Sequence, residues 1–165
     1  MFSILPAWGL SNTAATLVGQ NLGAGLPERA ETTTWKIAKY NSIYMGLAVA
    51  LMLLFTQPIV AMFSQEAEVL AYAMQCLRIF AYGYVFWGFG MATIQAFNGA
   101  GDTMTPTYIS IFCFWIVQLP LAYTLALGMG IGPVGVFWAV FVSDVLAGIV
   151  GVALFLRGKW KLRMV

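Results

Sequence analysis

The sequence predicts an all-α integral membrane protein, and three observations lead to this fold class. The chain is 61% hydrophobic and only 8% charged, whereas a soluble domain carries roughly a quarter charged residues. Its apolar stretches, with their flanks, are long enough to cross a bilayer. No stretch shows the strict alternation of apolar and polar residues that a membrane-spanning strand needs. The backbone hydrogen bonds are therefore expected to be satisfied within α-helices.

We expect about five membrane spans. The first covers residues 6–25, with Pro6 in its first turn, and its twenty residues reach roughly 30 Å, just enough to cross the bilayer. The others are predicted over residues 41–63, 69–98, 106–128 and 133–156, and Pro120 is expected to kink the fourth. Residues 157–165 form a basic tail.

The stretch GQNLGAGLPERAE, residues 19–31, is unusual because three glycines precede a charged run. A phosphate-binding loop needs either GxxxxGK[ST] or GxGxxG after a strand, and neither pattern is present. We instead interpret Gly19 and Gly23 as a GxxxG step for close helix contact, and Gly25 as the end of the first helix. Residues 27–40 are predicted to form an interfacial elbow, because Trp35 and Tyr40 suit a headgroup boundary.

The basic residues predict an orientation. Seven of the eight Lys and Arg residues follow the first or the fifth span. Five spans place both groups on one side, which the positive-inside rule makes cytoplasmic, and nucleic-acid binding is not indicated. The first residue would then lie outside without a signal sequence. We therefore expect at least one preceding span to be missing and the chain to be the tail of a larger protein.

Polar residues within the spans are the candidates for function, because they are costly in hydrocarbon. Asn12, Thr16 and Gln20 recur every four residues and so share one helix face. Asp144 lies about midway along the fifth span, where it is a candidate proton site, cation site or counter-ion. The alternative is a satisfied structural polar group or one that faces a wet vestibule. Asp144 borders a stripe of small residues suited to close packing: Gly135, Ala139, Ser143, Ala147 and Gly151.

Two further candidates are Arg78 and Gln118. Arg78 is the only basic residue within a span, where it could pair with an acid, bond to carbonyls or snorkel to the interface. Gln118 precedes Pro120, whose kink frees a backbone carbonyl. The chain has no histidine, no Ser, His and Asp set and no metal-ligand spacing. We therefore expect no enzyme, no resident cofactor and no metal site.

Three segments resemble the C-terminal lobe of a multidrug and toxic compound extrusion (MATE) transporter: AATLVGQNLGAGLPERAE, IQAFNGAGDTMTP, and GIGPVGVFWAVFVSDVLAGIVG with the closing RGKW. The resemblance implies twelve helices in two lobes, of which this chain would supply helices eight to twelve. It implies antiport of amphiphilic or cationic drug-like compounds against Na⁺ or H⁺. The expected location is the cell inner membrane, multi-pass, with a cytoplasmic C-terminus. The preceding helix and the N-terminal lobe would be missing partners.

The chain departs from the family at the coupling acids. These often lie on the first helix of the C-terminal lobe, on helix ten or in the N-terminal lobe, but residues 69–98 hold no Asp or Glu within their membrane core. Coupling would then rest on the missing lobe or on Asp144. Two alternatives stay open. One is a half-transporter or truncated remnant that acts only with a separate N-terminal lobe, and the other is a lipid-linked oligosaccharide flippase, although such a flippase would show a basic cavity.

Overall fold

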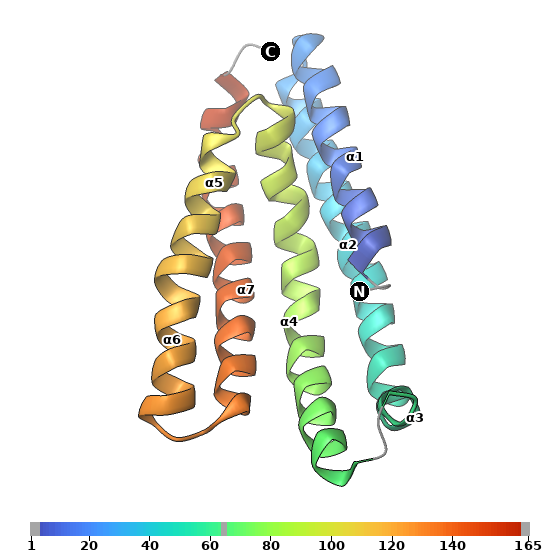
Figure 1. Ribbon diagram of the computed structural model, residues 1–165. Helices are drawn as coiled ribbons and strands as arrows, with labels where there is room; N and C mark the ends of the chain where they lie inside the picture. The colour runs from blue at the N-terminus through green and yellow to red at the C-terminus, as the bar shows by residue number, and fades with distance from the viewer. Residues whose placement is uncertain (1–3, 64–65, 163–165) are drawn as a thin grey trace.

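The computed structural model describes residues 4–63 and 66–162, and these residues form helices joined by short turns, without strands (Figure 1). The prediction of an all-α fold is confirmed. In chain order the elements are α1 (Ile4–Gly23), α2 (Pro27–Leu54), α3 (Thr56–Ala61), α4 (Ala67–Gly99), α5 (Met104–Ser110), the π-helical η1 (Ile111–Gln118), α6 (Leu119–Tyr123), the π-helical η2 (Thr124–Gly128), α7 (Pro133–Leu156) and the 3-10 helix η3 (Lys159–Leu162).

Among the described residues, four helical stretches are long and apolar enough to cross a membrane: Pro27–Leu54, Ala67–Gly99, Met104–Gly128 and Pro133–Leu156. We expected five, and α1 is not among them. Polar residues such as Asn12, Thr16 and Gln20 lower its mean hydropathy. The helix still lies along α2 and α4 in the bundle (Figure 1).

The elbow over 27–40 and the start of the second span form one helix in the structure. No Gly or Pro interrupts the chain between Glu28 and Met45, so nothing separates the two segments. This helix, α2, ends at Leu54 rather than at residue 63. The reason is Pro58, whose ring would clash with the carbonyl of Leu54 in a continuous α-helix. Thr56 donates a hydrogen bond to the Met52 carbonyl at 2.6 Å, and the short α3 follows.

The expected kink at Pro120 takes the form of wide helical turns. Proline lacks an N–H and its ring crowds the carbonyl four residues earlier, here Ile116. The stretches on both sides of α6 are π-helical, which makes room for the ring. At the end of η2 the Met129 N–H donates to the Thr124 carbonyl at 2.8 Å, a bond across five residues.

Helix α4 lies at the centre and packs against α1, α2 and α7. The small-residue stripe predicted on the last span is confirmed, since all five of its members are buried. Between α4 and α7, a Cβ on Gly90 would lie 2.4 Å from the Cα of Gly148. The GxxxG step is only half right: a Cβ on Gly19 would lie 3.1 Å from the Gly99 carbonyl oxygen, whereas a Cβ on Gly23 would meet no other helix within 4 Å among the described residues. Gly25 has the expected left-handed conformation, with φ of 72°.

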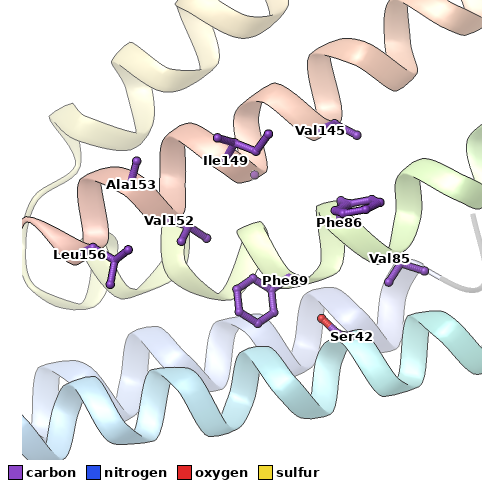
Figure 2. A pocket seen from close by; sticks show the side chains of 10 residues that line it. Ser42, Val85, Phe86, Phe89, Val145, Ile149, Val152, Ala153 and Leu156 are labelled. Carbon is purple, nitrogen blue, oxygen red and sulfur yellow. The ribbon is translucent and has the colours of Figure 1, made fainter.

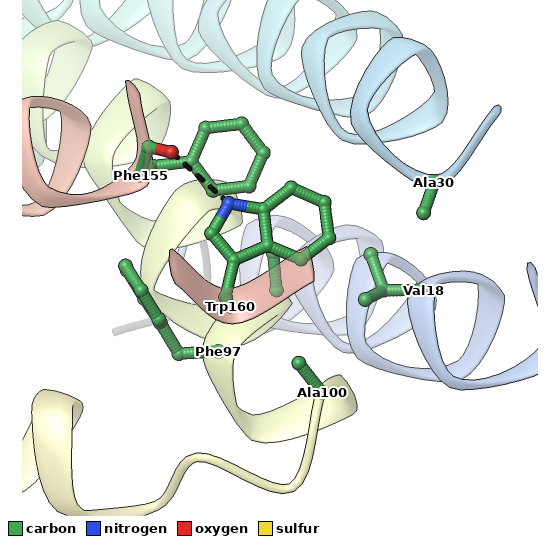
Figure 3. Close-up of a cluster of buried hydrophobic side chains, with 7 residues drawn as sticks. Val18, Ala30, Phe97, Ala100, Phe155 and Trp160 are labelled. Atoms are coloured by element: carbon green, nitrogen blue, oxygen red, sulfur yellow. Dashed lines mark hydrogen bonds between the residues drawn. The ribbon is translucent and has the colours of Figure 1, made fainter. Parts of the chain in front are cut away.

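A cluster of aromatic and small apolar side chains packs together the ends of α1, α4 and α7 and the start of α2 (Figure 3). The Trp160 ring stacks on Phe155 at a centroid distance of 4.7 Å. Its indole N–H donates to the Phe155 carbonyl at 3.0 Å. Phe97 of α4, Val18 of α1 and Ala30 of α2 complete the contact. The segment after α7 is thereby fixed to three other helices.

An ion pair between Lys161 and Glu31 adds a polar connection between η3 and α2. The basic residues that follow α1 and those that follow α7 therefore lie at the same end of the bundle, as Figure 1 also shows for the two chain segments.

Candidate functional site

Asp144 lies in a cavity of about 240 Å³ between α1, α4, η1 and α7. We call this space the acidic cavity, and its other lining residues are Ile4, Phe80, Tyr84, Trp87, Phe114 and Val140. Within the described part of the chain, the Asp144 carboxyl group makes no hydrogen bond and no ion pair. A carboxylate surrounded by aromatic rings is suited to an organic cation, because the charge and the ring faces both attract it.

A second cavity, of about 280 Å³, adjoins the first and shares Trp87 and Phe114 with it. It lies between α4, α5, η1 and α7, and its polar lining residues are Gln95, Asn98 and Ser110. We call it the amide cavity. No charged residue is among the described residues that line it.

Three carboxamides form a chain of hydrogen bonds at the amide cavity. Gln95 donates through Nε2 to Oδ1 of Asn12 at 2.9 Å. Asn98 donates through Nδ2 to Oε1 of Gln95 at 2.7 Å. The chain connects α1 with α4 and fixes the orientation of the Gln95 side chain, because its oxygen and its nitrogen are both engaged.

The structure brings some of the sequence-predicted site residues together and leaves others apart. Asn12 reaches the amide cavity through Gln95. Thr16 and Gln20 are exposed on α1, and the Thr16 hydroxyl donates to the Asn12 carbonyl at 3.3 Å. Arg78 is exposed on α4 and lines neither cavity. The functional roles of these residues stay predictions.

Gln118 has a structural partner beside Asp144. Its Oε1 accepts a hydrogen bond from the hydroxyl of the buried Ser143 at 3.1 Å, which connects η1 with α7. This bond holds the two helices together next to the acidic cavity. Gln118 itself lines neither cavity.

Several lining residues were not singled out from the sequence. Phe80, Tyr84, Trp87, Gln95 and Asn98 all lie on α4. They recur at intervals that fit one helix face, with Met91 between the third and the fourth. This pattern of aromatic and amide residues on one face of a helix could have predicted the cavity lining from the sequence.

A third space, an apolar groove of about 530 Å³, lies between α2, α4 and α7 (Figure 2). Ser42 is its one polar side chain among the described lining residues, and its hydroxyl is buried without a hydrogen-bond partner. The groove fits hydrocarbon but offers nothing that would hold a charge. The described residues also contain no group of three or more His, Cys, Asp or Glu side chains that could hold a metal ion.

The comparison with protein families decides the classification. Residues 1–124 match the MatE family model. The chain belongs to the MatE family. The resemblance seen in the sequence is thereby confirmed.

Individual relatives agree with this assignment. A probable multidrug resistance protein NorM from Thermotoga maritima is 24% identical over 166 residues, which cover 99% of this chain and 35% of that protein. One from Pasteurella multocida is 34% identical over 155 residues, covering 86% of this chain and 31% of that protein. This MatE chain thus spans about a third of the length of these relatives. Their names describe multidrug resistance, and the expectation that this chain is not an enzyme stays a prediction.

Proposed function

We propose that this MatE chain is part of a secondary active antiporter that exports amphiphilic, often cationic, organic compounds in exchange for Na⁺ or H⁺ by alternating access. The observation that carries the proposal is the Asp144 carboxylate in a cavity lined by four aromatic residues, within a chain of this family. The relatives are named as probable multidrug resistance proteins, which supports drug-like compounds as the cargo.

The acidic cavity accounts for the exchange. An organic cation gains about 0.5–2 kcal/mol for each favourable contact with an aromatic face, in addition to the attraction of the carboxylate. A proton or Na⁺ on Asp144 cancels the negative charge that holds the organic cation. The two cargoes therefore compete for one group, and an inward ion gradient displaces the organic cation.

The proposal includes partners beyond this chain. One lobe cannot form both walls of a central cavity, so we propose that a preceding helix and an N-terminal lobe complete the transporter. The alternative is a half-transporter or remnant that acts with a separate lobe. The DNA upstream of codon 1 discriminates them, since an in-frame region for about seven further hydrophobic spans supports one polypeptide and a separate reading frame supports an assembly.

The flippase alternative is less well supported by the cavities. A lipid-linked oligosaccharide carries phosphate, which requires Arg or Lys. The described residues that line the acidic and amide cavities include neither, and Arg78 lies outside both. For the location we propose the cell inner membrane with a cytoplasmic C-terminus, because the basic residues gather at the end of the bundle where α7 ends.

The experiment measures the efflux of tetraphenylphosphonium from cells that express the complete protein encoded by the gene. Asp144→Asn keeps the shape of the side chain and removes the charge, so we expect efflux to fall to background. Glu68→Gln is the matched control, because Glu68 is exposed in the first turn of α4, away from both cavities. Equal amounts of both variants in the membrane make the comparison valid. Normal efflux by Asp144→Asn at every pH would remove Asp144 from the mechanism.

A further inference from the structure

We propose that Gln95 and Asn98 form a neutral hydrogen-bonding subsite, which selects compounds that carry an amide, carbonyl or hydroxyl group at a fixed distance from their cationic group. The inference rests on the proposed function, because it takes Asp144 as the site of the cation. It adds a selectivity that a carboxylate among aromatic rings does not provide, since such a cavity accepts any organic cation of suitable size.

The amide cavity has the groups that such a subsite needs. Gln95 is held in one orientation by Asn12 on one side and Asn98 on the other. One Gln95 N–H stays available, and the Asn98 oxygen accepts no hydrogen bond from the described residues. Asn98 is exposed and bonded through Nδ2, so a ligand group would meet one donor on Gln95 that is oriented before binding and one acceptor on Asn98.

The two cavities lie at successive levels along the parallel helices α4 and α7. Helices α4 and α7 run in the same direction (Figure 1), and Gly83 meets Phe141, Gly90 meets Gly148, and Ile94 meets Gly151. This nearly constant offset places Asp144 level with about residue 86 of α4. Gln95 lies nine residues further along, which corresponds to about 13–14 Å at the rise of an α-helix.

The side chains between the two polar ends are aromatic. Trp87 and Phe114 line both cavities and so lie where the spacer of a bound compound would pass. Flat aromatic spacers pack well against such rings. Because no described residue that lines the amide cavity is charged, the group bound there is neutral rather than a second cation or an anion.

A purely structural role for the carboxamides makes a different prediction. The bond from Gln95 to Asn12 joins α1 to α4 and accounts for the position of Gln95. Asn98, however, bonds to Gln95 on its own helix and joins no other element by a side-chain hydrogen bond among the described residues. A structural role therefore predicts that Asn98→Ala leaves ligand preference unchanged, whereas the subsite predicts that it lowers the preference.

The test uses two probes with a rigid biphenyl spacer and a trimethylammoniomethyl group at one end. The first probe carries a carboxamide at the other end, and the second carries a methyl group there. Binding to the protein in detergent micelles is measured by calorimetry. We expect the wild-type protein to bind the carboxamide probe about three- to tenfold more tightly, the value of one net hydrogen bond. A second pair with a single phenyl spacer should show no preference, because its carboxamide cannot reach Gln95.

Variants separate this inference from the proposed function. Gln95→Leu and, independently, Asn98→Ala should lower the ratio of the two affinities towards one without weakening the binding of the methyl probe. Asp144→Asn should weaken the binding of both probes of the pair. Three results would overturn the subsite. The first is that both amide variants keep the wild-type preference for the carboxamide probe, and the second is that the wild-type protein binds both biphenyl probes equally. The third is that the short-spacer pair shows the same preference as the biphenyl pair. Unchanged binding of both probes by Asp144→Asn would overturn the cation site instead, and no binding of either probe by the wild type would overturn both.

Discussion

The contact between Gly90 and Gly148 predicts a clear effect of a single methyl group. In Gly90→Ala the new Cβ would lie 2.4 Å from the Cα of Gly148 and 3.4 Å from its carbonyl carbon and amide nitrogen. These atoms belong to the backbone, so no side chain can rotate away. Helices α4 and α7 must therefore move apart, and in lipid no hydrophobic force between helices compensates for the lost packing.

The size of the effect follows from two opposing contributions. Extra volume in a tightly packed contact costs about 1–3 kcal/mol. Replacing a helical glycine by alanine contributes about 0.5–1 kcal/mol of stabilisation through lower backbone entropy in the unfolded chain. Gly46→Ala in α2 is the matched control, because its Cβ would meet no other helix within 4 Å among the described residues, so only the second contribution applies. The two variants should therefore differ in free energy of unfolding by about 1–3 kcal/mol.

The assay is unfolding of the purified protein in mixed micelles of increasing sodium dodecyl sulfate content. Tryptophan fluorescence reports the transition, since the chain has six Trp residues. We expect the Gly90→Ala midpoint to fall and the Gly46→Ala midpoint to stay or rise. Equal midpoints for the two variants would refute the reasoning, because they would show that α4 and α7 separate at no cost.

Two further pairs of variants test contacts elsewhere in the bundle by the same unfolding assay. Trp160→Ala should lower the free energy of unfolding by about 3–5 kcal/mol, because it removes a buried stacked ring. Trp160→Phe should lower it by about 1 kcal/mol, because it chiefly removes a hydrogen bond. Equal losses for the two variants would contradict this division. Asn41→Ala should cost about 1–2 kcal/mol, because the buried Asn41 amide donates to Ser11 at 3.0 Å and to the Gly88 carbonyl at 2.7 Å. Ser42→Ala should be neutral or stabilising, because the buried Ser42 hydroxyl has no partner, and a greater loss for Ser42→Ala than for Asn41→Ala would contradict the assignment.

Periodicity within one helix was sufficient for part of this structure. The stripe from Gly135 to Gly151 has a helical spacing, so it is expected to be buried against a neighbouring helix whichever helix that is. The end of the first helix at Gly25 follows from local backbone preference. The predicted boundary between the elbow and the second span was wrong. The composition changes near residue 40, but no Gly or Pro interrupts the helix there, so α2 continues through this point.

The candidate site depended on contacts between distant residues, which one sequence without relatives does not specify. Gln95 and Asn12 are 83 positions apart, and each helix presents several polar faces that could have met. Asp144 was identifiable alone, because an acid at that depth is unusual. Its aromatic surroundings come from α4 and η1 and required the packing of three helices.

Close packing and binding space depend on the same residues at the centre of this chain. Gly90 and Gly148 form the closest contact between α4 and α7, and both also line the amide cavity. A side chain at either position would press against the backbone of the other helix and so separate the two helices that line this cavity. The helices can approach this closely and still leave a cavity because the contact is made by backbone alone, while larger side chains on either side hold the remaining surfaces apart. Stability and ligand preference should therefore change together in variants of these two glycines, whereas variants of the aromatic cluster around Trp160, which lines neither cavity, should change stability alone.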